Sequence, residues 1–159
     1  MTLLLAIKLV HVIGAAVLLG TGAGIAFFML MAHRTGDARL IAHTAGVVVL
    51  ADTLFTATAV VLQPLTGLWL ANLSGYGLTE FWIVCSLCLY AVTGLFWLPV
   101  VWIQLRLRAL ARQAADAGAP LPPAYYRLWR IWFACGFPAF AAVLAIFWLM
   151  IARPSAWPV

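Results

Sequence analysis

The sequence predicts an all-α integral membrane protein, a four-helix bundle with both termini on the outer (periplasmic) side of the membrane. Apolar residues make up 67% of the chain and charged residues 8%, whereas soluble domains have about half and about a quarter. The mean hydropathy is +1.11, and the loops between four long apolar stretches alternate in charge. This composition excludes a water-soluble enzyme. The nine Lys and Arg residues are too few to form a nucleic-acid-binding face.

Each apolar stretch is long enough to cross a bilayer as a helix, which takes about 20 residues. We place the helices at residues 3–32, 40–73, 81–105 and 131–152, within one domain that covers residues 1–159. The second stretch is the longest and contains Pro64. A proline removes a helical hydrogen bond, so we expect the last turns of this stretch to kink, tilt or lie at the interface.

The charges of the loops predict the orientation. Loop 33–39 carries two arginines, loop 72–80 carries no Lys or Arg, and loop 106–130 carries five arginines. The positive-inside rule places the first and third loops in the cytoplasm and both termini outside. Lys8 lies inside the first apolar stretch, whereas a signal peptide carries its positive charge ahead of it. We therefore expect the first stretch to be a retained transmembrane helix.

His11, in the outer half of the first helix, is a candidate metal ligand. Gly14 and Gly22 share its face, because successive helical residues are about 100° apart. Small residues beside a histidine leave room for a large flat group such as a porphyrin. Alternatively, His11 only forms a hydrogen bond to a neighbouring helix. Another face presents small residues suited to close helix contact, namely Ala16, Gly20 and Gly24.

The second helix has the most polar face. Thr56, Gln63 and Thr66 each fall within about 40° of Asp52 on the helical wheel. Asp52 is near mid-membrane, where a charge costs at least about 2.5–3.5 kcal/mol unless it is paired or neutral. One interpretation is functional: the face is a proton path or a polar anchor that faces a cofactor. The other is structural: the face forms a series of interhelical hydrogen bonds that hold the bundle together. Asp52 faces the bundle interior in both cases.

A second candidate site uses sulfur. Cys85 and Cys88 form a C-x-x-C at positions i and i+3 of the third helix, at the depth of His11 and Met150. One histidine, two cysteines and a methionine make a soft ligand set suited to Cu(I). Cysteine is also a common small apolar residue in buried positions. The copper site is therefore kept as an alternative.

The other two histidines flank the first loop. His33 and His43 lie at similar depth and could pair, although histidines at an interface are usually solvated. His43 is about 25–30 Å from His11 along the bundle, from the 1.5 Å rise per residue. These two histidines therefore cannot ligate one iron within one chain. A haem on His11 would be five-coordinate or would take Met150, or another outer-half group, as its second ligand.

The sequence resembles a family of small bacterial four-helix integral membrane proteins of unknown function. The resemblance covers nearly the whole chain and is loosely shared with the HemJ-type protoporphyrinogen oxidases and the CopD-type copper-resistance membrane proteins. The residues that carry it are Lys8-x-x-His11-Val-x-Gly14, Gly20-x-Gly22, His33-Arg34, the run 62–70 and the segment 97–102.

This resemblance implies a multi-pass protein of the bacterial inner membrane. In the HemJ-type proteins the first-helix histidine is implicated in binding haem b, and His11 occupies that position. The chain lacks the later Trp and the Pro-Arg pair of the HemJ-like pattern, and it lacks the Met-rich and His-rich segments of the CopD-like one. The resemblance therefore extends to haem binding but not to protoporphyrinogen oxidation or copper carriage.

Together these observations predict a haem-b-binding inner-membrane protein with a redox or electron-transfer role. The sequence leaves open whether the protein is an oxidoreductase. His11 would be the axial ligand, Asp52 and Gln63 would contact the macrocycle edge or relay protons, and Gly14, Gly22 and Met150 would complete the site. Copper handling and a cofactor-free accessory subunit of a larger complex are the alternatives. The expected partners are membrane lipid, a membrane redox protein and a second copy of the chain.

Overall fold

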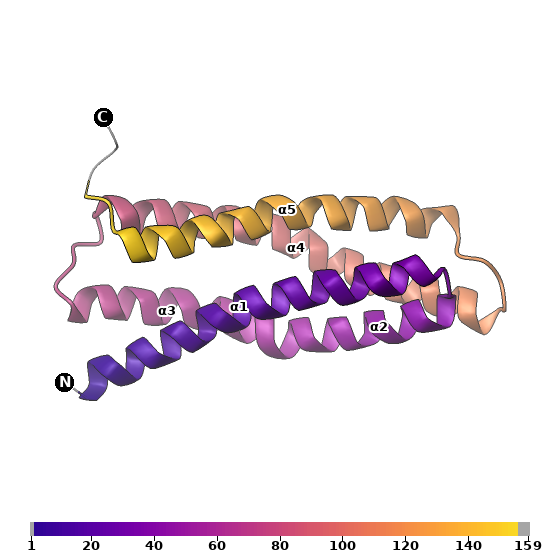
Figure 1. Cartoon of the computed structure of the whole chain (residues 1–159), viewed down its shortest axis with the longest axis horizontal. Helices are drawn as coiled ribbons and strands as arrows, with labels where there is room; N and C mark the ends of the chain where they lie inside the picture. The colour runs from indigo at the N-terminus through magenta and orange to yellow at the C-terminus, as the bar shows by residue number, and fades with distance from the viewer. Residues whose placement is uncertain (1, 156–159) are drawn as a thin grey trace.

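The computed structural model describes residues 2–155, which form helices joined by short loops (Figure 1). The elements in chain order are α1 (Thr2–Thr35), α2 (Ala38–Ala51), η1 (Asp52–Thr56), α3 (Ala57–Leu73), α4 (Phe81–Asp116) and α5 (Pro123–Ala152). Four spans are long and apolar enough to cross a membrane, the second being α2, η1 and α3 together. The predicted all-α, four-span architecture is confirmed.

The first two spans match the predicted ranges to within a few residues, but the connection between the third and fourth spans is much shorter than expected. α4 continues to Asp116, which confirms the expectation that residues 106–112 extend the third helix as far as a break at residues 118–123. α5 already begins at Pro123, so the connection consists of residues 117–122 only. Proline suits the first turn of a helix, where its missing N–H has no helical partner. The prediction of a start at residue 131 was wrong because polar residues 124–130 are helical as well.

The second span is irregular at a place that the sequence does not mark. Residues Asp52–Thr56 form the π-helical turn η1, while α3 runs through Pro64 to Leu73 as an α-helix. Single π turns widen a helix locally and occur often at functional sites. The departure from α geometry therefore surrounds Asp52 rather than Pro64.

The core is concentrated at one end of the bundle. α1 begins and α5 ends at the same end (Figure 1), which we call the terminal end. The opposite end, where the helix ends on either side of the two short loops carry arginines, is called the arginine-rich end. The largest fully buried side chains all belong to a cluster at the arginine-rich end, and they are Met29, Ile41, Leu107 and Tyr125. A much smaller cluster, formed by Ala71, Trp82, Ile83 and Leu149, lies at the terminal end.

The outward surface of the bundle is apolar. Leu9, Leu95 and Ile151 are among many large hydrophobic side chains that point away from the protein, a pattern that suits lipid and not water. Gly20 belongs to this surface, since a Cβ at this position would meet nothing within 4 Å. The small-residue face of α1 therefore makes no close helix contact at Gly20 within the described residues 2–155.

His33 does not lie free at the interface as expected. Its ring stacks on Trp129, with centroids 4.1 Å apart and planes inclined by 10°. Its Nδ1 is 3.2 Å from the hydroxyl of Tyr125. His43 is exposed, and no contact joins the two histidines among residues 2–155. The early start of α5 explains the difference, because it brings Tyr125 and Trp129 beside α1.

Replacing Leu107 with Ala should destabilise the bundle measurably. Leu107 is fully buried in the large cluster, so the substitution leaves a cavity. Lipid is as apolar as leucine, so we expect a cost near the lower end of the soluble-protein range, about 2 kcal/mol. Leu98→Ala on the same helix, where the side chain is 65% exposed, is the control. Unfolding in detergent should separate the two variants, and equal stabilities would contradict the assigned core.

Candidate functional site

A cavity of about 1170 Å³ extends between the helices from the terminal end toward the middle of the bundle, and it is partly open to the outer surface, where exposed side chains such as Val12 and Phe137 line it. α1 and α3 form one side, and α4 and α5 form the other. Its walls are mostly apolar, and it is larger than the roughly 300–1,000 Å³ typical of small-molecule pockets. Lys8 and Arg153 line it at the terminal end, and Gln104 and Trp132 line it deep in the bundle. Ligand chemistry therefore has to be sought along this cavity.

His11 lines the cavity, and its ring forms a hydrogen bond with the second span. The Nδ1 atom lies 2.8 Å from Oγ1 of Thr66. That hydroxyl has one proton, which it donates to the carbonyl oxygen of Leu62 at 2.7 Å, with the Gln63 carbonyl at 3.3 Å. With the hydroxyl proton on the Leu62 carbonyl, Thr66 accepts from His11, an arrangement in which Nδ1 carries the ring proton and Nε2 keeps a lone pair.

Gln63 ties α3 to α1 directly beside this histidine. Its side-chain Nε2 donates to the backbone carbonyl of His11 at 2.8 Å. A Cβ on Gly14 would overlap this amide nitrogen, so the missing side chain of Gly14 makes room for Gln63. A Cβ on Gly67 would lie 3.1 Å from Cε1 of His11. Two glycines thus allow the histidine and the glutamine to fit between the helices.

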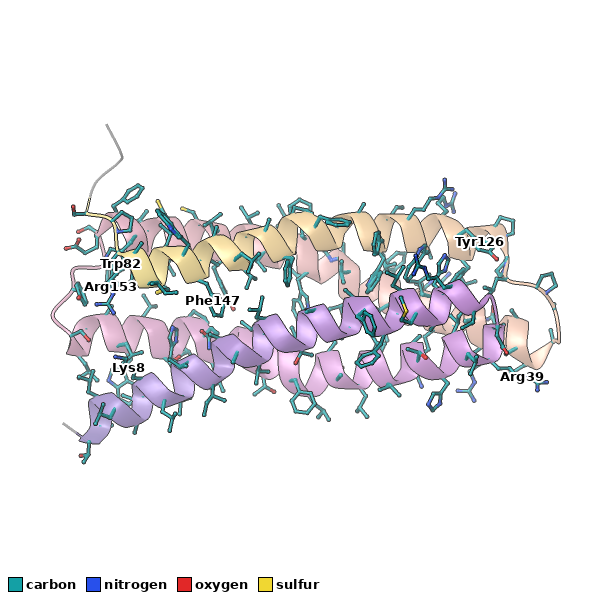
Figure 2. All side chains as sticks on the ribbon, viewed as in Figure 1. Lys8, Arg39, Trp82, Tyr126, Phe147 and Arg153 are labelled. Carbon is teal, nitrogen blue, oxygen red and sulfur yellow. The ribbon has the colours of Figure 1, made fainter. Side chains whose placement is uncertain are left out.

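The terminal end of the cavity is positively charged (Figure 2). Arg153 donates from Nη1 to the hydroxyl of Tyr76 at 2.8 Å, and its guanidinium lies over the rings of Tyr76 and Trp82 at 5.4 and 5.8 Å. Lys8 is exposed at the same end. Among the described residues, neither Lys8 nor Arg153 forms a salt bridge. Two cations are therefore available to an anionic group of a ligand.

The deep part of the cavity contains Asp52. Its side chain is 5% exposed, which confirms the prediction that it faces the interior. The Oδ1 atom accepts a hydrogen bond from Nε1 of Trp97 at 3.4 Å. Its other oxygen, Oδ2, is buried and has no partner within residues 2–155. On the polar face of the second span, Gln63 and Thr66 thus form hydrogen bonds to His11 of α1. Among the described residues, Asp52 forms no such bond to α1 and leaves one carboxylate oxygen without a partner.

Most of the predicted site residues line the same cavity, at different depths. His11, Gly22, Asp52, Gln63 and Met150 all line the one cavity, whereas Gly14 lies behind Gln63. Their roles toward a cofactor stay predictions.

The alternative copper ligands are not assembled. In the described part of the chain, no group of three or more His, Cys, Asp and Glu residues could hold a metal ion. Cys88 is exposed, and Cys85 packs against the small cluster at the terminal end; neither lines the cavity. The geometry therefore gives no support to copper bound by His11, Cys85 and Cys88.

Four cavity residues were missed by the reasoning from sequence, namely Trp97, Gln104, Trp132 and Arg153. Gln104 is an amide in a transmembrane helix, and the rule that singled out Gln63 should also have singled it out. Tryptophans near the ends of a span usually belong to the membrane interface, which is why Trp132 did not stand out as a cavity residue.

Fold and site define a class: a four-span membrane protein with an internal cavity that holds a histidine and is lined by cations at one end. A family model described as "predicted integral membrane protein (DUF2269)" matches residues 5–154. The chain belongs to this family, whose description assigns no activity. No curated protein matches the chain, and no solved structure does.

Proposed function

We propose that this protein binds haem b in the cavity, with Nε2 of His11 as the axial ligand to the iron. The carrying observation is the hydrogen bond between His11 Nδ1 and Thr66 Oγ1. Histidines that bind metals almost always donate their second ring N–H to an oxygen acceptor, which fixes the tautomer and the ring orientation. Thr66 Oγ1 is an oxygen partner of this kind for His11 Nδ1, and the ring lines a cavity large enough for a porphyrin.

The charges support the same ligand. Haem b is a flat apolar macrocycle with two carboxylates on one edge. The walls of the cavity are apolar, and Lys8 and Arg153 line its terminal end, where they would pair with those carboxylates. Gly22 leaves part of the wall without a side chain, and Met150 supplies a thioether on α5. A methionine is an established partner of histidine on haem iron.

Bound haem supplies one-electron redox chemistry, and the chain's own residues hold and orient it. Thr66 fixes the ring of His11, and Gln63 fixes the backbone of α1 beside it. Asp52, on the same cavity, is a candidate for moving a proton. We propose an electron-transfer role in the bacterial inner membrane, with both termini outside and a membrane redox protein as partner.

The test is an absorption spectrum of the full chain, expressed with a haem precursor and purified in mild detergent. We expect a Soret band in the oxidised protein, a sharp α-band after reduction with dithionite, and equimolar haem in a pyridine haemochrome assay. A flat visible spectrum would overturn the proposal and leave the cofactor-free accessory subunit. Elemental analysis of the same sample would reveal bound copper.

A further inference from the structure

The deep end of the cavity contains more polar atoms than the protein itself can satisfy. Four buried side-chain atoms have no partner at hydrogen-bonding distance within residues 2–155: Asp52 Oδ2, Thr56 Oγ1, Gln104 Oε1 and Trp132 Nε1. Asp52 and Thr56 lie near enough to interact with each other, so Gln104 and Trp132 are the clearest of the four. All four residues are at least nine-tenths buried and line the cavity. Buried polar groups are nearly always paired, so each exception calls for an explanation. Here the four exceptions all line the deep part of the same cavity, on η1, α4 and α5.

This place is well separated from His11. Asp52 and Gln63 are eleven residues apart on the second span, which corresponds to about 16 Å at the helical rise. Gln63 bonds to the backbone of His11, so the histidine lies near that level. Asp52 is near the middle of the span, where a charged ligand group is costly. A ligand at this depth therefore carries an uncharged polar group, which excludes a phospholipid head group.

The four atoms offer both kinds of hydrogen bonding. Trp132 Nε1 is a donor, Gln104 Oε1 is an acceptor, and the Thr56 hydroxyl serves as either. Asp52 Oδ2 adds a further acceptor. The indole of Trp97 is held in place by its bond to Asp52. Indole faces favour stacking with a flat ring, and the cavity continues from here along apolar walls toward the terminal end.

We infer that the deep end of the cavity is a second subsite, which binds the head group of an isoprenoid quinone or quinol. This class of molecule has an uncharged flat ring with oxygens on opposite edges and an apolar tail, and it is soluble in the middle of the membrane. The quinone oxygens accept from Trp132 and Thr56, and the quinol hydroxyls also donate to Gln104 and Asp52. The inference does not depend on haem binding at His11.

Binding is tested with the full chain in nanodiscs of quinone-free lipid. Short-chain ubiquinone and ubiquinol are the probes, and the bound probe is quantified after rapid separation of the nanodiscs. We expect saturable, equimolar binding above that of empty nanodiscs. Gln104→Leu removes the amide with little change in volume, and Trp132→Phe removes the indole N–H together with one ring. Each should weaken affinity about three- to tenfold, as expected for the loss of one hydrogen bond.

A matched pair of threonine variants controls for effects of the cavity wall. Thr93 also lines the cavity, but its hydroxyl donates to the carbonyl of Leu89 at 2.9 Å. Thr56→Val should weaken probe binding, whereas Thr93→Val should leave it unchanged. Non-saturable partitioning equal to that of empty nanodiscs would overturn the inference, as would wild-type affinity in all three deep-end variants, which would indicate bound water only.

A His11→Phe variant separates this inference from the haem proposal. We expect it to bind the quinone probe with wild-type affinity, because the deep-end atoms are unchanged. Loss of probe binding in this variant would contradict a separate subsite. A colourless wild-type protein that binds the probe would instead contradict the haem proposal and leave the quinone subsite supported.

Discussion

His11→Phe should purify without haem. The substitution removes the Nε2 lone pair, which is the proposed bond to iron, and replaces the imidazole with a ring of similar shape. Loss of a partner that only orients a ligand costs about 10–100-fold in metal affinity, so loss of the ligand itself should cost more. The measurement is haem per chain by pyridine haemochrome, on protein expressed with a haem precursor.

His43→Phe is the control for this experiment. It is the same substitution at an exposed position at the arginine-rich end of the bundle, and it should keep the haem content of the wild type. A second variant, His11→Gly, tests the chemistry directly. Exogenous imidazole should partly restore its haem binding, because imidazole can occupy the vacated space and supply the missing nitrogen. Haem content unchanged in His11→Phe would refute the assignment of the ligand.

The spans could be predicted because the bilayer imposes a simple rule on them. A stretch of about 20 apolar residues has to be helical in lipid, and four such stretches are visible in the sequence. The start of α5 could not be predicted in the same way. Residues 124–130 are polar enough to resemble a loop, and their helix is decided by packing, in which Tyr125 is fully buried and Trp129 stacks on His33.

The candidate site was predictable to the extent that it follows one helical face. His11 was identified because an ionisable group in lipid is costly, and Asp52, Gln63 and Thr66 because they share a face of the second span. Which helix that face meets was not predictable. The bond from Thr66 to His11 joins residues 55 positions apart, and pairings at such separations are not visible in periodicity.

Two features of the site have no local mark in the sequence. The π turn at Asp52–Thr56 replaces α geometry without a proline or glycine inside it. Gly14 was interpreted as open space for a cofactor, but its space is taken by the amide of Gln63. A glycine indicates that something approaches the backbone closely, and only the three-dimensional arrangement shows what approaches.

Thr66→Val tests whether the bond to His11 Nδ1 matters to the proposed ligand. Valine matches threonine in shape but has no oxygen, so the imidazole loses the acceptor that fixes its tautomer and orientation. We expect haem affinity to fall about 10–100-fold, as for other partners of metal-bound histidines. The affinity is measured by titrating haem into the apo-protein and following the Soret band.

Thr58→Val is a closely matched control. Thr58 is on the same helix, and its hydroxyl donates to the carbonyl of Leu54 at 2.7 Å, as that of Thr66 donates to Leu62. Its side chain is exposed on the lipid surface. Both variants lose the same intrahelical bond, so a general effect on the helix would weaken both. Only Thr66→Val should bind haem more weakly, and equal affinities would show that Thr66 does not orient the ligand.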